Sequence, residues 1–166
     1  MVVYLIGFMG SGKSTIAKRL ANKIGYQFID LDVYIEQKYM FSIAELFSKY
    51  GEDYFRTLET KSLQEINNDE CVIATGGGTP CFANNMELMK SRGKTIYLEL
   101  SNEALYSRLV NVKHKRPATQ NLDEQGLKDF ITAKMQARKP IYEQASFTIN
   151  AFDVQVIEKI ETFILG

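Results

Sequence analysis

A glycine-rich segment near the N-terminus has the residue types and the spacing of a phosphate-binding loop. The stretch GFMGSGKS, residues 7–14, fits the pattern G-x-x-x-x-G-K-[ST] and lies between an apolar run and a helical pattern. Its glycines would let backbone N–H groups surround phosphate oxygens at a helix N-terminus, where the helix dipole favours anions. Lys13 would reach the β- and γ-phosphates of a nucleotide, and the Ser14 hydroxyl would ligate Mg²⁺. The alternative interpretation is an ordinary glycine-rich turn.

Two carboxylates, Asp30 and Asp32, stand two residues apart in the segment FIDLDVYIE. On a strand, residues i and i+2 face the same side, so both side chains could enter one crevice. Two carboxylates this close repel each other unless a cation or a proton lies between them. Mg²⁺ near Ser14 would supply the cation for Asp30, which leaves Asp32 to contact a phosphoryl acceptor. Alternatively, one or both residues cap the helix that follows.

Two arginines stand where they could bind a substrate carboxylate. Arg56, in GEDYFRTLE, is followed three residues later by Glu59, with which it can pair on one helix face. Arg138, in ARKPIYE, precedes Pro140 near a predicted helix end, where the helix dipole favours a cation. Taken alone, each arginine has a purely structural explanation, as a surface ion pair or as a helix-terminal cation.

Three consecutive glycines, Gly76–Gly78, follow a third apolar run. Three glycines in a row carry a large cost in conformational entropy. The triplet therefore predicts that a ligand approaches the backbone too closely for even a methyl group. A plain flexible turn is the alternative, but such a turn needs only one glycine.

The segment at 112–123 is basic and polar, and it includes the stretch VKHKRPATQN. Its composition predicts a mobile lid, with Arg116 placed to fold over the phosphates of ATP. A nucleic-acid contact is the alternative interpretation. The segment is short, however, and it lacks the aromatic side chains on which bases would stack.

Strand and helix patterns alternate along the chain. Strands are predicted at 2–6, 26–30, 71–74, 94–100 and 146–150. Helices are predicted at 13–24, 33–67 with breaks near 40–42 and at Gly51, 83–91, 101–111, 124–137 and 154–163. This alternation predicts an α/β three-layer sandwich around a parallel sheet with right-handed crossovers. Because ligands of such sheets bind at the carboxyl ends of the strands, the chemically unusual segments should meet in one crevice.

Composition narrows the function classes. The 166 residues suit a single domain, 1–166, and 20 basic residues balance 20 acidic ones. This balance predicts neither nucleic acid nor a membrane as partner, and the apolar run at 2–6 is too short to span a bilayer. Two cysteines, Cys71 and Cys81, without a Cys/His cluster predict neither a disulfide nor a zinc site, which favours a cytoplasmic location.

A phosphate-binding loop does not by itself name a substrate. A GTPase would need an Asn-Lys-x-Asp motif, which the chain lacks, and a motor ATPase would need a longer chain. A kinase for a small molecule is therefore the most economical interpretation. Gluconate kinase and a non-catalytic nucleotide-binding module remain as rivals.

Taken together, these segments resemble the shikimate kinase family. The resemblance is carried, in order, by GFMGSGKST, DLDVYIE, SIAELF, GEDYFRTLE, TGGG, an Arg-Pro pair and ARKPIYE. It covers nearly the whole chain and implies a five-stranded sheet of the P-loop kinase type in the order 2-3-1-4-5. It also implies a shikimate-binding region at about 32–60, a lid at about 112–123, and transfer of the γ-phosphoryl group of ATP to shikimate in aromatic amino-acid biosynthesis.

The resemblance also implies residue roles. ATP would be bound by Gly10, Ser11, Gly12, Lys13, Ser14, Thr15 and Arg116; Mg²⁺ by Ser14 and Asp30; and shikimate by Asp32, Arg56, Gly77, Gly78 and Arg138. Lys13, Asp32 and Arg116 would be catalytic, and a monomer is expected. Where the family often has an arginine seven residues before the lid arginine, this chain has Leu109, and Arg108 stands beside it.

Overall fold

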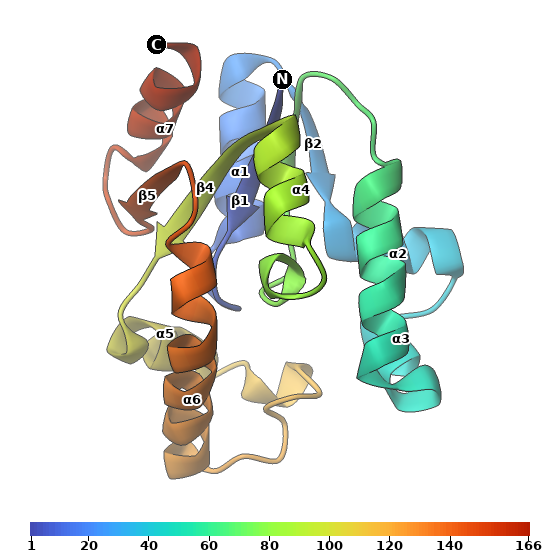
Figure 1. The fold of residues 1–166 in the computed structure, drawn as a ribbon. Coiled ribbons are helices and arrows are strands. Elements are labelled where there is room, and N and C mark those ends of the chain that lie inside the picture. Colours follow the sequence, from blue (N-terminus) through green and yellow to red (C-terminus); the bar gives the residue numbers. More distant parts are fainter.

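Five parallel strands form the centre of the computed structural model, which describes residues 1–166 (Figure 1). The strands are β1 (Val2–Ile6), β2 (Gln27–Asp30), β3 (Cys71–Ala74), β4 (Gly93–Glu99) and β5 (Phe147–Asn150). Their order in the sheet is β2-β3-β1-β4-β5, and every neighbouring pair is parallel. The predicted α/β fold and strand order are confirmed.

Helices cover both faces of the sheet. They are α1 (Lys13–Ile24), α2 (Leu31–Tyr39), α3 (Ile43–Glu65), α4 (Asn85–Arg92), α5 (Asn102–Leu109), α6 (Glu124–Tyr142) and α7 (Val156–Leu165), with the short 3₁₀ helices η1 (Thr79–Cys81) and η2 (Lys113–Lys115). Helices α1 and α7 contact each other on one face, and α4 packs against β4 on the other (Figure 1). Accordingly, every residue of β1 and β3 is buried, as expected of central strands in a three-layer fold.

The register of the strands brings three loops to one edge of the sheet. Leu5 of β1 and Asp30 of β2 both pair with Ala74 of β3, so these residues stand level across the sheet. The segments that follow them therefore start side by side. These are the segments that the sequence singled out for their chemistry.

The breaks predicted in the long helical region are confirmed. Helix α2 ends at Met40, which has a φ of 59°, and Gly51 interrupts α3 with a φ of 82° and a ψ of 172°. The first of these helices begins at Leu31, two residues earlier than predicted, because the Asp30 side chain accepts hydrogen bonds from the first helical N–H groups.

The prediction that a helix ends near residue 137 is wrong. Helix α6 continues through Pro140 to Tyr142, so Arg138 lies within the helix and is buried. Proline removes only one backbone hydrogen bond. The helix continues because Met135, Arg138 and Tyr142, at positions i, i+3 and i+7, keep one face packed beyond the proline.

A smaller difference concerns the start of the helix predicted at 83–91. That helix starts at Asn85, and the residues before it form η1 and a turn. None of the helices combines the length and the apolar character that crossing a bilayer requires.

Candidate active site

The phosphate-binding loop lies between β1 and α1, as predicted, and its lysine is folded back onto it. Gly7, Gly10 and Gly12 have positive φ angles, which let the backbone curl tightly. Lys13 Nζ donates to the carbonyl oxygens of Gly7 and Phe8, both at 2.8 Å. Burial lowers the pKa of Lys13 to about 8, and the charge of Asp32 partly opposes that effect. The ammonium group is thus held ready beside the loop, bound only to carbonyl groups.

Asp30 connects the loop to the start of α2. Its Oδ2 accepts a hydrogen bond from Ser14 Oγ at 2.5 Å, and its Oδ1 accepts from the N–H groups of Asp32 and Val33 at 3.1 and 3.3 Å. The capping interpretation therefore applies to Asp30. Its bonded partner Ser14 is exposed, so a hydroxyl and a carboxylate oxygen meet at the surface of the loop.

Asp32 lies in the first turn of α2, so the expectation that it shares a strand face with Asp30 is wrong. The strand ends at Asp30, and the turn of the helix directs both side chains to the same cavity. Burial, and after it the negative charges of Glu59 and Asp30, together raise the pKa of Asp32 to about 6, against the attraction of Lys13. A carboxyl group with this pKa can change its protonation state near neutral pH.

A cavity of about 320 Å³ collects most of the predicted phosphate-site residues. It is lined by Met9, Gly10, Gly12, Lys13, Ser14, Thr15, Asp30, Asp32, Thr75, Gly76, Gly77, Arg108, Val112 and Arg116. Of the predicted site residues, Ser11, Arg56, Gly78 and Arg138 do not line it. Ser11 is buried within the loop, whereas Gly78 belongs to the glycine triplet, and Arg56 and Arg138 approach that triplet at Gly78 and Gly77.

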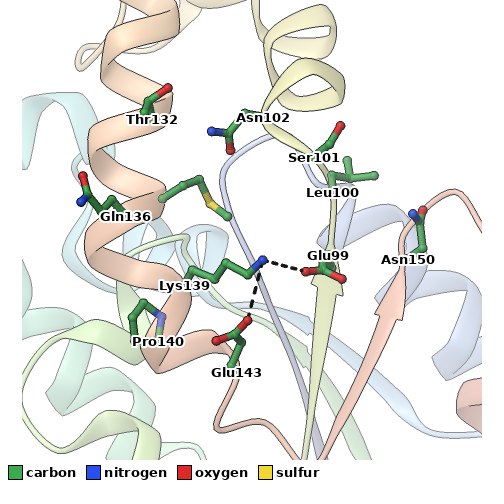
Figure 2. Close-up of a pocket in the computed structure, with 11 residues that line it drawn as sticks. Glu99, Leu100, Ser101, Asn102, Thr132, Gln136, Lys139, Pro140, Glu143 and Asn150 are labelled. Atoms are coloured by element: carbon green, nitrogen blue, oxygen red, sulfur yellow. Dashed lines mark ion pairs between the residues drawn. The ribbon is translucent and has the colours of Figure 1, made fainter.

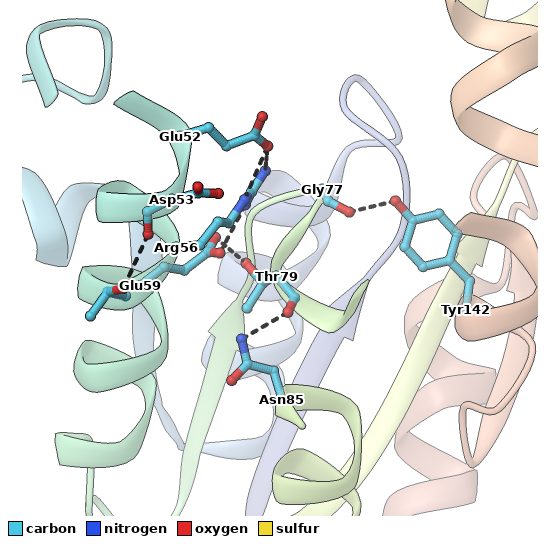
Figure 3. A network of polar contacts seen from close by, with 9 residues as sticks. Glu52, Asp53, Arg56, Glu59, Gly77, Thr79, Asn85 and Tyr142 are labelled. Atoms are coloured by element: carbon cyan, nitrogen blue, oxygen red, sulfur yellow. Dashed lines mark hydrogen bonds and ion pairs between the residues drawn. The ribbon is translucent and has the colours of Figure 1, made fainter. Parts of the chain in front are cut away.

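Arg56 is held by two carboxylates, which Figure 3 shows, and by an aromatic ring. Its Nη1 donates to Glu59 at 2.8 Å, and its Nη2 donates to Glu52 at 3.2 Å. The guanidinium carbon lies 4.1 Å from the centroid of the Phe82 ring. The predicted pairing with Glu59 is confirmed, but it is not a surface ion pair, because the Glu59 side chain is only 1% exposed.

Arg138 is the second arginine of this group; it is buried, and it forms no ion pair. Its guanidinium carbon lies 5.8 Å from the centroid of the Phe8 ring in the phosphate-binding loop. One turn further along α6, the Tyr142 hydroxyl donates to the carbonyl of Gly77 (Figure 3). The explanation of Arg138 as a helix-terminal cation is wrong, since the residue lies inside the helix and its charge has no protein carboxylate as a partner.

The glycine triplet is required by space and not by backbone angles, because none of the three glycines has a positive φ. A Cβ atom on Gly78 would lie 2.5 Å from Arg56 Nη2, and one on Gly77 would lie 3.1 Å from the N atom of Met9 and 3.6 Å from Arg138 Nη1. Neighbouring protein atoms, and not only a ligand, therefore exclude side chains at these positions. The two arginines thus approach consecutive residues of one loop.

The region predicted as a lid consists of η2 and a series of turns. Arg116 is exposed and lines the phosphate-site cavity. Thr119 is buried, and its hydroxyl donates to the carbonyl of Lys113 at 2.8 Å, which closes the segment on itself. The mobility of the segment stays a prediction.

Arg108 is a cavity residue that the sequence analysis did not assign. Its guanidinium nitrogen Nη1 would lie 3.5 Å from a Cβ atom on Gly12, and its guanidinium carbon is 5.3 Å from the centroid of the exposed Phe152 ring. The neighbouring Leu109 is buried and packs under Gly10. The sequence did contain a signal, because Arg108 stands next to Leu109, the position where the family often has an arginine. Only the structure of α5 shows that Arg108, and not Leu109, lines the cavity.

A second cavity, of about 860 Å³, lies between α6 and the ends of β4 and β5 (Figure 2). None of the residues predicted for the site lines it. Its cation, Lys139, is paired with Glu99 at 3.3 Å and with Glu143 at 3.7 Å. The one cation of this cavity is thus paired with two carboxylates, and the cavity lacks the free cations and the glycine-rich backbone that phosphate binding requires.

Comparison with known proteins agrees with this arrangement. The sequence profile described as shikimate kinase matches residues 9–165. The chain is 43% identical to a shikimate kinase of Parabacteroides distasonis over 150 residues, covering 90% of this chain and 87% of that one. The crystal structure of shikimate kinase from Bacteroides thetaiotaomicron superposes with a TM-score of 0.93 at 37% identity, covering 100% and 99% of the two chains.

A shikimate kinase from Acinetobacter baumannii, solved in complex with shikimate, is 36% identical and superposes with a TM-score of 0.85. That comparison covers 99% of this chain and 92% of the other. Profile, sequence and fold therefore agree over nearly the full length of the molecule, and the chain belongs to the shikimate kinase family.

Proposed function

We propose that this protein phosphorylates shikimate with ATP, and that Asp32 is the residue at which the two substrates meet. The observation that carries the proposal is the position of Asp32. It lines the phosphate-site cavity together with Lys13, and its Oδ1 would lie only 3.2 Å from a Cβ atom on Gly76, the first residue of the triplet that Arg56 and Arg138 approach. A carboxylate between a phosphate cradle and two arginines suits transfer from a nucleotide to a substrate that is itself an anion.

On the nucleotide side, the backbone of Gly10–Thr15 would surround the phosphates of ATP. Lys13 would exchange its two carbonyl partners for phosphate oxygens, and Arg116 would approach from the lid region. Such groups stabilise the charge that spreads over the transferring phosphoryl group. Arg108, which lies beside Gly12, adds a further cation at the edge of the same cavity.

The Ser14 hydroxyl and the Asp30 carboxylate fit a Mg²⁺ ion. Both are hard oxygen donors, they lie 2.5 Å apart, and they line the phosphate-site cavity. Mg²⁺ commonly takes only one or two protein ligands and completes its octahedron with water and phosphate oxygens. The absence of any group of three or more acidic, His or Cys side chains therefore agrees with this kind of site. A bound ion would supply positive charge to the phosphates, with Asp30 as the protein carboxylate nearest to it.

On the acceptor side, the region at about 32–60 and the glycine triplet would bind shikimate. The guanidinium groups of Arg56 and Arg138 would hold the carboxylate, and the backbone of Gly77 and Gly78 would lie against the ring and its hydroxyl groups. Arg138 carries a buried charge without a carboxylate partner, which a substrate carboxylate would supply. The ring would then lie between the arginines and Asp32.

The chemical step would be an in-line transfer. A shikimate hydroxyl oxygen attacks the γ-phosphorus, the bond from that phosphorus to the β–γ bridging oxygen breaks, and Asp32 accepts the hydroxyl proton. The products are shikimate 3-phosphate and ADP. Closure of the segment at 112–123 would exclude water, which otherwise competes as the acceptor.

An assay of ADP release with and without shikimate tests this function. We expect ADP formation that depends on shikimate and on Mg²⁺, with gluconate as an inactive control. Equal turnover with gluconate would assign the site to another small-molecule kinase. Binding of ATP without turnover of any acceptor would assign it to a nucleotide-binding module.

We also infer a monomeric, cytoplasmic enzyme without nucleic-acid partners. The two cysteines are free thiols, and the formal net charge of zero provides no field that would attract a polyanion. Sedimentation of the protein should give a single species of the chain mass, 18.9 kDa, with and without substrates. A dimer at micromolar concentration would contradict the inference.

A further inference from the structure

We propose that Thr79 and Asn85 are positioning residues for the substrate carboxylate, because they fix the Glu59 side chain and thereby the guanidinium group of Arg56 (Figure 3). Neither residue was predicted from the sequence, and neither lines the phosphate-site cavity. The inference rests on the proposed role of Arg56 in binding shikimate. It goes beyond that role by naming the residues that orient the Arg56 side chain.

The first step concerns Glu59, a carboxylate that is wholly buried. Each of its oxygens has one side-chain donor: Oε2 accepts from Arg56 Nη1 at 2.8 Å, and Oε1 accepts from Thr79 Oγ1 at 2.6 Å. A buried carboxylate with so few partners depends strongly on each of them. Without the Thr79 hydroxyl, Oε1 would lose its donor, and the carboxylate would be free to rotate away from the arginine.

The second step concerns Thr79, which is itself held in place. It is the first residue of η1, and its N–H donates to the carbonyl of Gly76 at 3.2 Å. Its own carbonyl accepts a hydrogen bond at 2.9 Å from Asn85 Nδ2, a buried side chain in the first turn of α4. A chain of three contacts thus runs from α4 through η1 to the arginine on α3.

The third step is that the same segment connects both arginines. The Phe82 ring, directly after η1, lies under the guanidinium of Arg56, and Gly77 accepts a hydrogen bond from Tyr142 on the helix that carries Arg138. The segment 76–82 therefore contacts Arg56 at one end and the helix of Arg138 at the other. Its conformation sets the separation of the two guanidinium groups, and with it the fit to one carboxylate.

The test compares Thr79→Val with Thr79→Ser. Valine keeps the shape of threonine but removes the donor, whereas serine keeps the hydroxyl. We expect Thr79→Val to raise the KM for shikimate roughly tenfold, the scale of one buried charge-assisted hydrogen bond, and Thr79→Ser to change it by less than about threefold. The KM for ATP should stay unchanged in both, because Thr79 does not line the nucleotide cavity.

Thr57→Val is the matched control. It makes the same chemical change on α3, next to Arg56, but the Thr57 hydroxyl donates to the backbone carbonyl of Asp53 and has no part in the network. We expect wild-type constants for this variant. Asn85→Ser tests the other end of the chain of contacts and should raise the KM for shikimate in the same direction as Thr79→Val.

The readout that separates positioning from general stability is discrimination between shikimate and its uncharged carboxamide. Wild type should prefer the acid, and Thr79→Val and Asn85→Ser should lose most of that preference. An equal loss toward acid and amide, or a parallel rise in the KM for ATP, would overturn the inference. If the wild type itself showed no preference for the acid, the proposed role of Arg56 in binding the carboxylate would be refuted. That outcome can be distinguished from a failure of the positioning role alone, in which the wild type prefers the acid and the variants keep that preference. Should Thr79→Val not fold, the same comparison on Asn85→Ser decides.

Discussion

We predict that Asp32→Asn makes the ligand-free protein more stable while it removes most of the activity. The pKa of Asp32 is raised from 3.8 to about 6, chiefly by burial and then by the charges of Glu59 and Asp30. A shift of this size means that folding disfavours the charged form by roughly 3 kcal/mol. Asparagine has nearly the same shape and stays neutral, so it should recover most of that free energy.

The size of the effect depends on pH. Because the pKa of Asp32 is higher in the folded than in the unfolded protein, the charge costs nothing below pH 3.8, and the cost grows until pH 6. The expected gain in the free energy of unfolding is about 1 kcal/mol near pH 4.5 and about 3 kcal/mol near pH 7.5. The second value is an upper bound, since Lys13 loses the attraction of Asp32 in the variant.

Urea unfolding of both proteins at the two pH values measures this difference. For a domain of this size, ~3 kcal/mol corresponds to a rise in Tm of roughly 6–12 °C. Asp30→Asn is the contrasting variant and should bring no gain, because Asp30 accepts bonds from Ser14 and from the start of α2. An Asp32→Asn variant no more stable than wild type near pH 7.5 would refute the reasoning.

The same substitution tests the role of Asp32 in catalysis. We expect kcat to fall by at least ~10²-fold, the scale of a positioned general base. In the wild type, log(kcat/KM) should fall by one unit per pH unit below about pH 6, because the carboxylate takes up a proton. An unchanged kcat with only a raised KM would instead assign Asp32 to binding.

Four further perturbations address the rest of the site. Lys13→Ala should lower kcat more than tenfold in a folded protein, since so central a charge should be worth more than ~1.4 kcal/mol in the transition state; steady-state kinetics and circular dichroism check this. Arg56→Lys or Arg138→Lys should raise the KM for shikimate roughly tenfold and leave that for ATP unchanged, because lysine lacks the bidentate fork. Gly78→Ala should also raise the KM for shikimate, since its methyl group would lie 2.5 Å from the Arg56 guanidinium. Hydrogen exchange at 112–123 should slow when nucleotide and shikimate are added, and equal exchange in both states would contradict a lid.

Much of the fold followed from patterns in the sequence, because the apolar runs and their turn residues are local signals. The order of the strands came from the family resemblance, since no local pattern encodes which strands are neighbours. The local rules failed at Pro140, where a packed helix face outweighs the loss of one hydrogen bond. They failed again at Asp32, where the cap formed by Asp30 starts a helix two residues early.

The residues of the site also differ in whether a local sequence pattern reveals them. The phosphate-binding loop and the Arg56–Glu59 pair are close in sequence, so their spacing alone was informative. Thr79 lies 20 residues from its carboxylate partner, and Tyr142 lies 65 residues from the Gly77 carbonyl it contacts. Contacts of this kind leave no local pattern, and they become visible only when the sheet brings the segments together.

The glycine triplet shows how these contacts combine into one site. Gly76–Gly78 have ordinary backbone angles, so any small residue could adopt them, and the reason for glycine must lie in their surroundings. A side chain there would meet Glu59 at one position, Met9 of the phosphate-binding loop at the next and Arg56 at the last. The triplet therefore contacts both the phosphate-binding loop and the two arginines that we propose bind the substrate carboxylate. Phosphoryl transfer needs the two substrates in direct contact, and a loop without side chains next to Asp32 would leave room for that contact.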